Sequence, residues 1–229
     1  MRIVIILFAT LLYISCKKNT SVTMTINNNM SYKFLALGDS YTIGQSVSSS
    51  ERFPNQTAEM LKSMNKNVLA PEIIAMTGWT TRDLLNALNS DAPGNNFSIV
   101  TLLIGVNNQY QGLHIDQYRL EFTELLLKAI QYADNKSNRV FVLSIPDYGV
   151  TPFAQGTDTA KIAREIDQFN SVNKEISLSY GVNYLDITPI SREGRTDNTL
   201  HANDGLHPSG KQYKKWADLL APLIAEKIQ

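Results

Sequence analysis

Five short apolar runs, each followed by a longer amphipathic segment, constrain the fold of this chain more than any other feature. The runs are rich in Val, Ile, Leu and Phe, and several are nearly continuous, as in strands that are buried on both faces of a parallel sheet. They lie at 32–37, 68–76, 97–104, 139–145 and 182–187. The alternation predicts an α/β fold, a three-layer α/β/α sandwich around a mostly parallel five-stranded sheet.

The segments between these runs carry apolar residues at helical spacing and predict helices at 54–64, 81–89, 116–134, 158–180 and 209–228. Thr80 suits the start of the second helix, and Gly181 stands where a glycine commonly ends the fourth. In the last helix, Tyr213 and Trp216 are expected in the core. Pro222 predicts a kink or a restart of that helix.

Charge and cysteine content exclude several classes of function. Lys and Arg together number 21, as do Asp and Glu, so the formal net charge of zero predicts no nucleic-acid partner and no broad attraction to an anionic membrane. The single cysteine excludes an intrachain disulfide and a cysteine-rich zinc site. With 229 residues, of which 43% are hydrophobic, the chain is long enough for one domain with one sizeable core.

The N-terminal residues resemble a bacterial lipoprotein signal. Arg2 precedes an apolar run at 3–14 that is too short for a comfortable membrane span but suits a secretory signal. The run leads to Ser15 and Cys16, and such signals are cleaved before a cysteine that carries the lipid, although Tyr13 stands where leucine is more usual.

We therefore predict a signal peptide at 1–15, a lipidated flexible tether at 16–31 and one folded domain at 32–229. The protein should be exported and held at the periplasmic or cell-surface face of a membrane only through the lipid on Cys16. The alternative is a secretory signal or an uncleaved anchor with a coincidental cysteine.

The stretch LALGDSY at 35–41 places a serine just beyond the end of the first predicted strand. Gly38 permits a tight turn there, so Ser40 can stand clear of the core and meet a substrate. This favours Ser40 as a nucleophile. The alternative is that Asp39 and Ser40 only cap the segment that follows.

Polar residues also follow the other predicted strands. Because open α/β folds bind ligands at the carboxyl ends of their strands, these residues should converge on one edge of the sheet. They are Gly78, Asn107, Asn108, Asp147, His201, Asp204 and His207.

Asp204 and His207 can activate a serine hydroxyl. A serine is a weak nucleophile until an imidazole takes its proton, and the imidazole needs a carboxylate to fix its tautomer. A spacing of three residues across a glycine-containing turn lets these two side chains lie side by side. The backbone amides of Ser40 and Gly78 and the side-chain amide of Asn107 are candidates for binding an oxyanion.

The spacing of His201, Asp204 and His207 is also compatible with a metal site. Gly205 and Pro208 disfavour the helical presentation that such a site would use, and no further ligand cluster is evident. We therefore predict no metal and no cofactor.

Four sequence blocks resemble those of the SGNH/GDSL hydrolase superfamily and occur in its order. They are GDSY at 38–41, the glycine of TGWTT at Gly78, GVN at 105–107 and DGLHPSG at 204–210. The resemblance implies a flavodoxin-like fold with strand order 2-1-3-4-5 and ester hydrolysis through an acyl-enzyme. It implies Ser40 as the nucleophile, His207 as the base and Asp204 as the residue that orients the base. Gly78 and Asn107 would complete the oxyanion hole with the Ser40 amide.

At Asn108 the chain departs from the family, which usually has aspartate there, so the hydrogen bonds that support this loop should differ. Trp79, Asn108 and Tyr148 are candidates for the wall of a substrate pocket. We predict a serine esterase that acts on short acyl or acetyl esters of glycans or small molecules. The alternatives are a lysophospholipase or other lipid acyl hydrolase and, in a different class, a non-catalytic glycan- or lipid-binding lipoprotein.

Overall fold

The computed structural model describes residues 31–228. The predicted signal peptide, Cys16 and the predicted tether up to residue 30 lie outside the described residues. Within the described range, no helix combines the length and the apolar character needed to cross a membrane.

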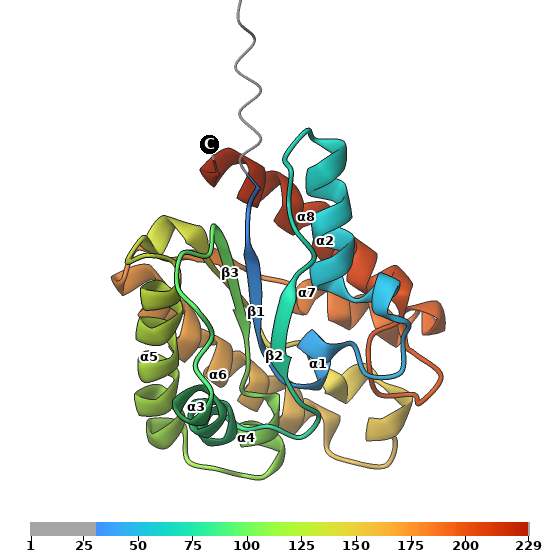
Figure 1. Ribbon diagram of the computed structural model, residues 1–229. Helices are drawn as coiled ribbons and strands as arrows, with labels where there is room; N and C mark the ends of the chain where they lie inside the picture. Colours follow the sequence, from blue (N-terminus) through green and yellow to red (C-terminus); the bar gives the residue numbers. More distant parts are fainter. Residues whose placement is uncertain (1–30, 229) are drawn as a thin grey trace, which may run out of the picture.

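The sheet contains β1 (Phe34–Gly38), β2 (Glu72–Ala75), β3 (Ile99–Leu103), β4 (Val140–Leu143) and β5 (Asn183–Leu185). All neighbouring strands pair in parallel, in the order β2-β1-β3-β4-β5. Helices cover both faces of the sheet (Figure 1). The predicted three-layer sandwich and the strand order 2-1-3-4-5 are therefore confirmed.

The position of each strand in the sheet explains its composition. β1, β3 and β4 are buried along their whole length, so their sequences are apolar without alternation. The edge strand β2 is more exposed, and it begins only after Pro71 because proline lacks the amide that a ladder uses. Val68, at the start of the same apolar run, makes one isolated bridge to Tyr32.

Five long helices lie close to the predicted segments: α2 (Phe53–Ser63), α3 (Thr81–Ser90), α5 (Ile115–Tyr132), α6 (Thr159–Ser179) and α8 (Gly210–Lys227). The first and last of these pack together on one face of the sheet, and the other three cover the opposite face (Figure 1). Gly181 has a left-handed backbone (φ 67°) just beyond α6, as expected for a glycine that ends a helix.

The last helix continues through Pro222, so the predicted restart at this residue is wrong. Proline removes the hydrogen bond to the carbonyl of Asp218, but both residues are exposed, so water can bind that carbonyl. The opposite face of α8 carries Tyr213 and Trp216, which are fully buried, as predicted, and contact Phe53 of α2.

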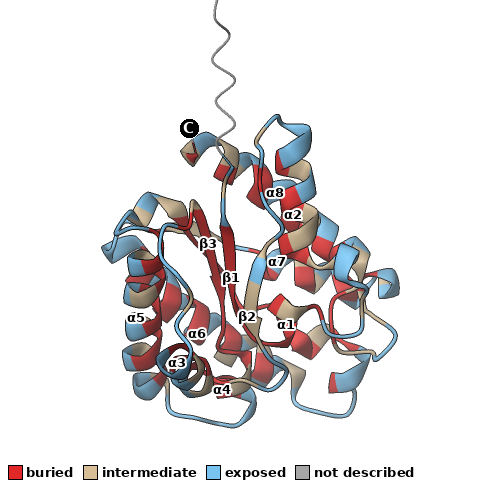
Figure 2. Ribbon diagram, viewed as in Figure 1, coloured by how far each residue is buried: buried red, intermediate tan, exposed pale blue. Residues whose placement is uncertain are grey.

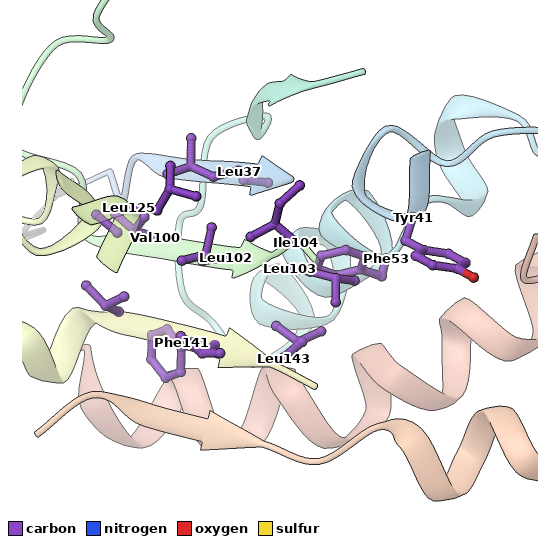
Figure 3. Packing of buried hydrophobic residues seen from close by; sticks show 14 of the residues in the cluster. Leu37, Tyr41, Phe53, Val100, Leu102, Leu103, Ile104, Leu125, Phe141 and Leu143 are labelled. Carbon is purple, nitrogen blue, oxygen red and sulfur yellow. The ribbon is translucent and has the colours of Figure 1, made fainter. Parts of the chain in front are cut away.

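The core extends to the carboxyl ends of the strands. Figure 2 shows the buried sheet between helices whose outer faces are exposed. In Figure 3, Leu37, Leu102 and Phe141 pack along neighbouring strands, and Tyr41 lies beyond the end of β1. This packing fixes the edge of the sheet at which the polar residues converge.

Three short helices begin where the sequence predicted loops: α1 (Ser40–Ile43), α4 (Val106–Tyr110) and α7 (Thr188–Arg192). Helices of four or five residues contain little more than one turn, so they leave no apolar periodicity to detect. The first two follow β1 and β3 and carry residues of the predicted site.

Candidate active site

Ser40 follows β1 as the first residue of α1. A Cβ atom on Gly38 would lie 2.4 Å from the carbonyl oxygen of Leu103, so only glycine fits before the turn. Oδ1 of Asp39 accepts a 3.0 Å hydrogen bond from the Tyr41 amide and caps the short helix. Asp39 therefore shapes the turn that carries Ser40. Burial raises the pKa of the Asp39 carboxyl to about 7, and this effect outweighs the hydrogen bond from the Tyr41 amide, which by itself would lower the pKa.

Ser40 lines a cavity of about 160 Å³ at the carboxyl ends of the strands. A cavity of this size holds a group about as large as benzene. Gly78, Asn107, Tyr148 and His207, which we also predicted for the site, lie in the same lining. No sequence pattern marks the remaining lining residues, which are Tyr41, Thr77, Val106, Tyr110, Phe153 and Leu206.

The side chain of His207 is paired with Asp204 beside the cavity. Nδ1 of the imidazole lies 2.6 Å from Oδ2 of the carboxylate. Oδ1 accepts hydrogen bonds from the backbone amides of Leu206 (3.0 Å) and His207 (2.9 Å), so the turn itself orients the carboxylate. The His207 ring also packs edge-on against Tyr41, with 5.7 Å between the ring centroids. These contacts fix the imidazole and direct Nε2 away from the carboxylate.

Hydrogen bonds stabilise the charged form of Asp204. Burial raises the pKa of this carboxyl, but the Ser46 hydroxyl, two backbone amides and the His207 ring all donate to it and hold its pKa well below its usual range. Asp204 is therefore ionised near neutral pH. Sequence reasoning missed Ser46, which is 158 residues away along the chain.

The three predicted oxyanion donors lie around this cavity. The Ser40 amide belongs to the first turn of a helix, where N–H groups lack intrahelical partners. Gly78 has a φ of 86°, and no atom lies within 4 Å of where its Cβ would stand, so its backbone is open to a ligand. Asn107 donates one side-chain hydrogen to the Trp79 carbonyl (2.9 Å), which leaves its second hydrogen available.

The structure corrects the predicted place of Asn108 in the pocket wall. This side chain is fully buried, accepts a hydrogen bond from the Thr81 amide (3.0 Å) and donates one to the Thr81 hydroxyl (2.7 Å). The hydroxyl in turn donates to Glu121, which also pairs with Arg82 (2.8 Å). The buried carboxylate of this network therefore comes from α5, while position 108 supplies a neutral amide.

Three other residues at this edge of the sheet are used elsewhere. The ring of Trp79 packs against the core and is not part of the cavity lining, contrary to our prediction. The buried carboxylate of Asp147 pairs with Arg192 (2.9 Å), and Nε2 of His201 contacts the carbonyl of Gly194 (3.0 Å). Among residues 31–228, no group of three or more His, Cys, Asp or Glu side chains is arranged to hold a metal ion.

Aromatic rings form one wall of the cavity. Tyr148 is mostly buried and supports Tyr110, with 5.9 Å between the ring centroids, and Tyr110 lies 6.1 Å from Phe153. Tyr110 and Phe153 are 59% and 48% exposed, respectively. Their faces therefore offer apolar contact area to a substrate that enters the cavity.

Residues 36–215 match the GDSL-like lipase/acylhydrolase family. The chain belongs to this family. Its membership identifies the protein as a hydrolase, in agreement with the resemblance seen in the four sequence blocks. No curated protein has a significant sequence match to it.

Solved structures similar to this GDSL-like hydrolase have the same fold. The lipase Lip_vut3 from a goat rumen metagenome is 19% identical, with a TM-score of 0.67 over 84% of this chain and 97% of that one. The lipase/acylhydrolase from Enterococcus faecalis is 21% identical, with a TM-score of 0.63 over 86% and 97%. A variant of Axe2, an acetyl xylan esterase from Geobacillus stearothermophilus, is 20% identical, with a TM-score of 0.64 over 84% and 94%.

Proposed function

We propose that this GDSL-family protein is a serine ester hydrolase that cleaves carboxylic esters through an acyl-enzyme. One observation carries the proposal: Nδ1 of His207 is held 2.6 Å from Asp204, and the same imidazole lines a cavity together with Ser40. Nucleophilic attack by a serine requires this combination of hydroxyl, imidazole and carboxylate.

In the proposed reaction, Ser40 Oγ attacks the ester carbonyl carbon while Nε2 of His207 takes the hydroxyl proton. Asp204 stabilises the resulting imidazolium. The amides of Ser40 and Gly78 and the second side-chain hydrogen of Asn107 bind the oxyanion. The imidazolium then protonates the leaving alcohol, and a water activated by the same imidazole releases the acid from Ser40.

We propose that the substrates are neutral esters with a short acyl or acetyl group on a glycan or small molecule. No Asp, Glu, Lys or Arg lines the cavity among the described residues, so a charged head group has no ionic partner there. The volume of about 160 Å³ suits a small group. An acetyl xylan esterase among the structures with this fold agrees with the proposal.

A lysophospholipase or other lipid acyl hydrolase is the second candidate. The exposed faces of Tyr110 and Phe153 favour it, because they extend the apolar wall beyond the cavity and could contact a longer acyl chain. Hydrolysis rates for an acyl chain-length series of aryl esters, an acetylated oligosaccharide and a lysophospholipid separate the two candidates.

We also propose export and a membrane anchor through a lipid on Cys16. The described residues begin near the amino end of β1, and the cavity lies beyond the carboxyl end of this strand (Figure 1). Metabolic labelling with a radioactive fatty acid should label the wild-type chain and not the variant Cys16→Ala; a wild-type chain without label would contradict the lipid anchor.

The variant Ser40→Ala tests the catalytic assignment. The wild-type chain should hydrolyse an aryl acetate and react with a fluorophosphonate, whereas Ser40→Ala should do neither while its circular dichroism spectrum is unchanged. Retained turnover in the variant would overturn Ser40 as the nucleophile. A wild-type chain that neither turns over esters nor reacts with the fluorophosphonate would indicate the non-catalytic binding protein instead.

A further inference from the structure

A short segment after α1 contacts each part of the candidate site. The amide of Gln45 donates to the carbonyl of Ser40 (3.0 Å), and Oε1 of Gln45 accepts a hydrogen bond from the Thr77 hydroxyl (2.8 Å). The hydroxyl of Ser46 donates to Oδ2 of Asp204 (2.6 Å). Thr77 immediately precedes the oxyanion glycine. The segment therefore joins the serine turn both to the oxyanion loop and to the loop that carries the imidazole.

The backbone of this segment is unusual at Ser46, which is left-handed (φ 67°) although it is not glycine. Gly44 is also left-handed (φ 69°), but it ends α1, where glycine commonly adopts this conformation. Non-glycine residues in this region cost free energy and persist where other contacts hold them, often at functional sites. The contact at Ser46 is its bond to Asp204.

We propose that Gln45 and Ser46 are positioning residues for the ester hydrolysis proposed above, on which this inference rests. Gln45 holds the loop of Gly78 at a fixed distance from the serine turn. Ser46 holds the carboxylate of Asp204, which in turn orients the imidazole. Neither side chain lines the cavity, so both act through other residues.

The Ser46 hydroxyl also changes how the carboxylate acts on the imidazole. Oδ2 of Asp204 accepts hydrogen bonds from both Ser46 and His207, so two donors share the charge of one oxygen. Without the hydroxyl, that oxygen stabilises the cationic imidazole more strongly.

Asp39, whose buried carboxyl has a pKa raised to about 7, caps the turn behind Tyr41 and makes no hydrogen bond to the pair, and it is present in every Ser46 variant. The other groups that contact the pair do not titrate near neutral pH. They are the two backbone amides of the turn and the ring of Tyr41, and burial raises the pKa of Tyr41 well above its ordinary value. Loss of the Ser46 hydroxyl should therefore move the acid limb of the activity profile to higher pH.

The variants Ser46→Ala and Ser46→Gly test this role in the full chain, with p-nitrophenyl acetate as substrate. We expect Ser46→Ala to lower kcat about tenfold with KM within about twofold, as for the loss of one hydrogen bond to a charged group, and to shift the acid limb to higher pH. Ser46→Gly relieves the backbone but also lacks the hydroxyl, so it should show the same changes. Ser50→Ala, which removes another exposed serine nearby, should match the wild type.

Gln45→Ala tests the second contact. It should lower kcat by weakening the hold on the oxyanion loop, and it should leave the acid limb in place because Gln45 does not contact the carboxylate–imidazole pair. Wild-type kcat in this variant would overturn the role of Gln45.

Circular dichroism and thermal unfolding establish that each variant folds. The role of Ser46 would be overturned if both Ser46 variants had the same kcat as the wild type. It would also be overturned if kcat fell but the acid limb stayed at the wild-type pH. If Ser40→Ala retains turnover, the proposed function itself fails. If Ser40→Ala is inactive while the Gln45 and Ser46 variants match the wild type, only the positioning inference fails.

Discussion

Nδ1 of His207 lies 2.6 Å from Oδ2 of Asp204, and this bond directs the other ring nitrogen away from the carboxylate. Nε2 can take a proton from Ser40 only while it is unprotonated, so activity should fall on acidification. Hydrogen bonds hold the pKa of Asp204 well below its usual range despite its burial, so ionisation of Asp204 should not contribute to the acid limb. A plot of log kcat/KM against pH should have an acid limb with a slope of about one. A flat acid limb would contradict His207 as the base.

The variant Asp204→Asn should lower kcat by about 10²- to 10⁴-fold because the amide no longer fixes the imidazole tautomer or stabilises its cation. Steady-state kinetics with an aryl acetate checks this value. Asp197→Asn is the matched control, since Asp197 is a carboxylate outside the cavity that pairs with Lys211 (2.8 Å). Equal losses in the two variants would show that Asp204 has no special role.

The buried network at Asn108 predicts a coupling that a double-mutant cycle can measure. Thr81 has one hydroxyl hydrogen, which goes to Glu121 because Asn108 donates to the hydroxyl oxygen. Asn108→Asp would place a second buried carboxylate beside the same hydroxyl, so it should lower the free energy of unfolding by about 2–4 kcal/mol.

Glu121→Gln combined with Asn108→Asp should recover part of that loss, because only one carboxylate then faces Thr81. Urea unfolding of the two single variants and the double variant gives the coupling free energy. Additive effects of the two substitutions would show that Asn108 and Glu121 are independent.

The fold was predictable because burial on both faces makes each central strand a continuous apolar run. The places of Ser40, Gly78 and His207 around one cavity followed from strand ends that meet at one edge of the sheet. These features are local in sequence, and parallel-sheet topology converts them into neighbours.

The supporting contacts were not predictable in the same way. Ser46 reaches Asp204 across 158 residues, and Thr81 reaches Glu121 across 40, so no local pattern marks either pair. Asn108 was misplaced because α4 was not predicted. In that short helix, successive residues point in different directions, so Asn107 lines the cavity while Asn108 turns to Thr81.

The aromatic wall predicts how the protein discriminates among esters. Tyr110 is 59% exposed and supported by Tyr148, so Tyr110→Ala should remove substrate contact area without opening the core. We expect KM for p-nitrophenyl hexanoate to rise about three- to tenfold and KM for the acetate to change less. Tyr180→Ala, which removes an exposed tyrosine outside the cavity lining, is the matched control. Equal changes for both esters would contradict a role of this wall in acyl-group binding.

The carboxyl of Asp39 predicts a pH dependence of stability that is separate from catalysis. Burial raises its pKa from an ordinary value of 3.8 to about 7, and Oδ2 has no hydrogen-bond partner among the described residues. The folded state therefore keeps this proton up to about pH 7, whereas the unfolded chain releases it above about pH 4. The stability contributed by the protonated carboxyl is full below pH 3.8, declines as the pH rises and is lost above about pH 7.

Asp39→Asn cannot ionise and retains an oxygen that can accept from the Tyr41 amide. Its free energy of unfolding, relative to the wild type, should rise between about pH 4 and pH 7 by an amount on the order of a few kcal/mol and then level off. Urea unfolding across this range measures the difference, with the exposed Asp91→Asn as the control. A constant difference would mean that Asp39 is ionised throughout. If the acid limb of the activity profile lies at the same pH in Asp39→Asn as in the wild type, the carboxyl of Asp39 does not cause it, and the limb belongs to the imidazole.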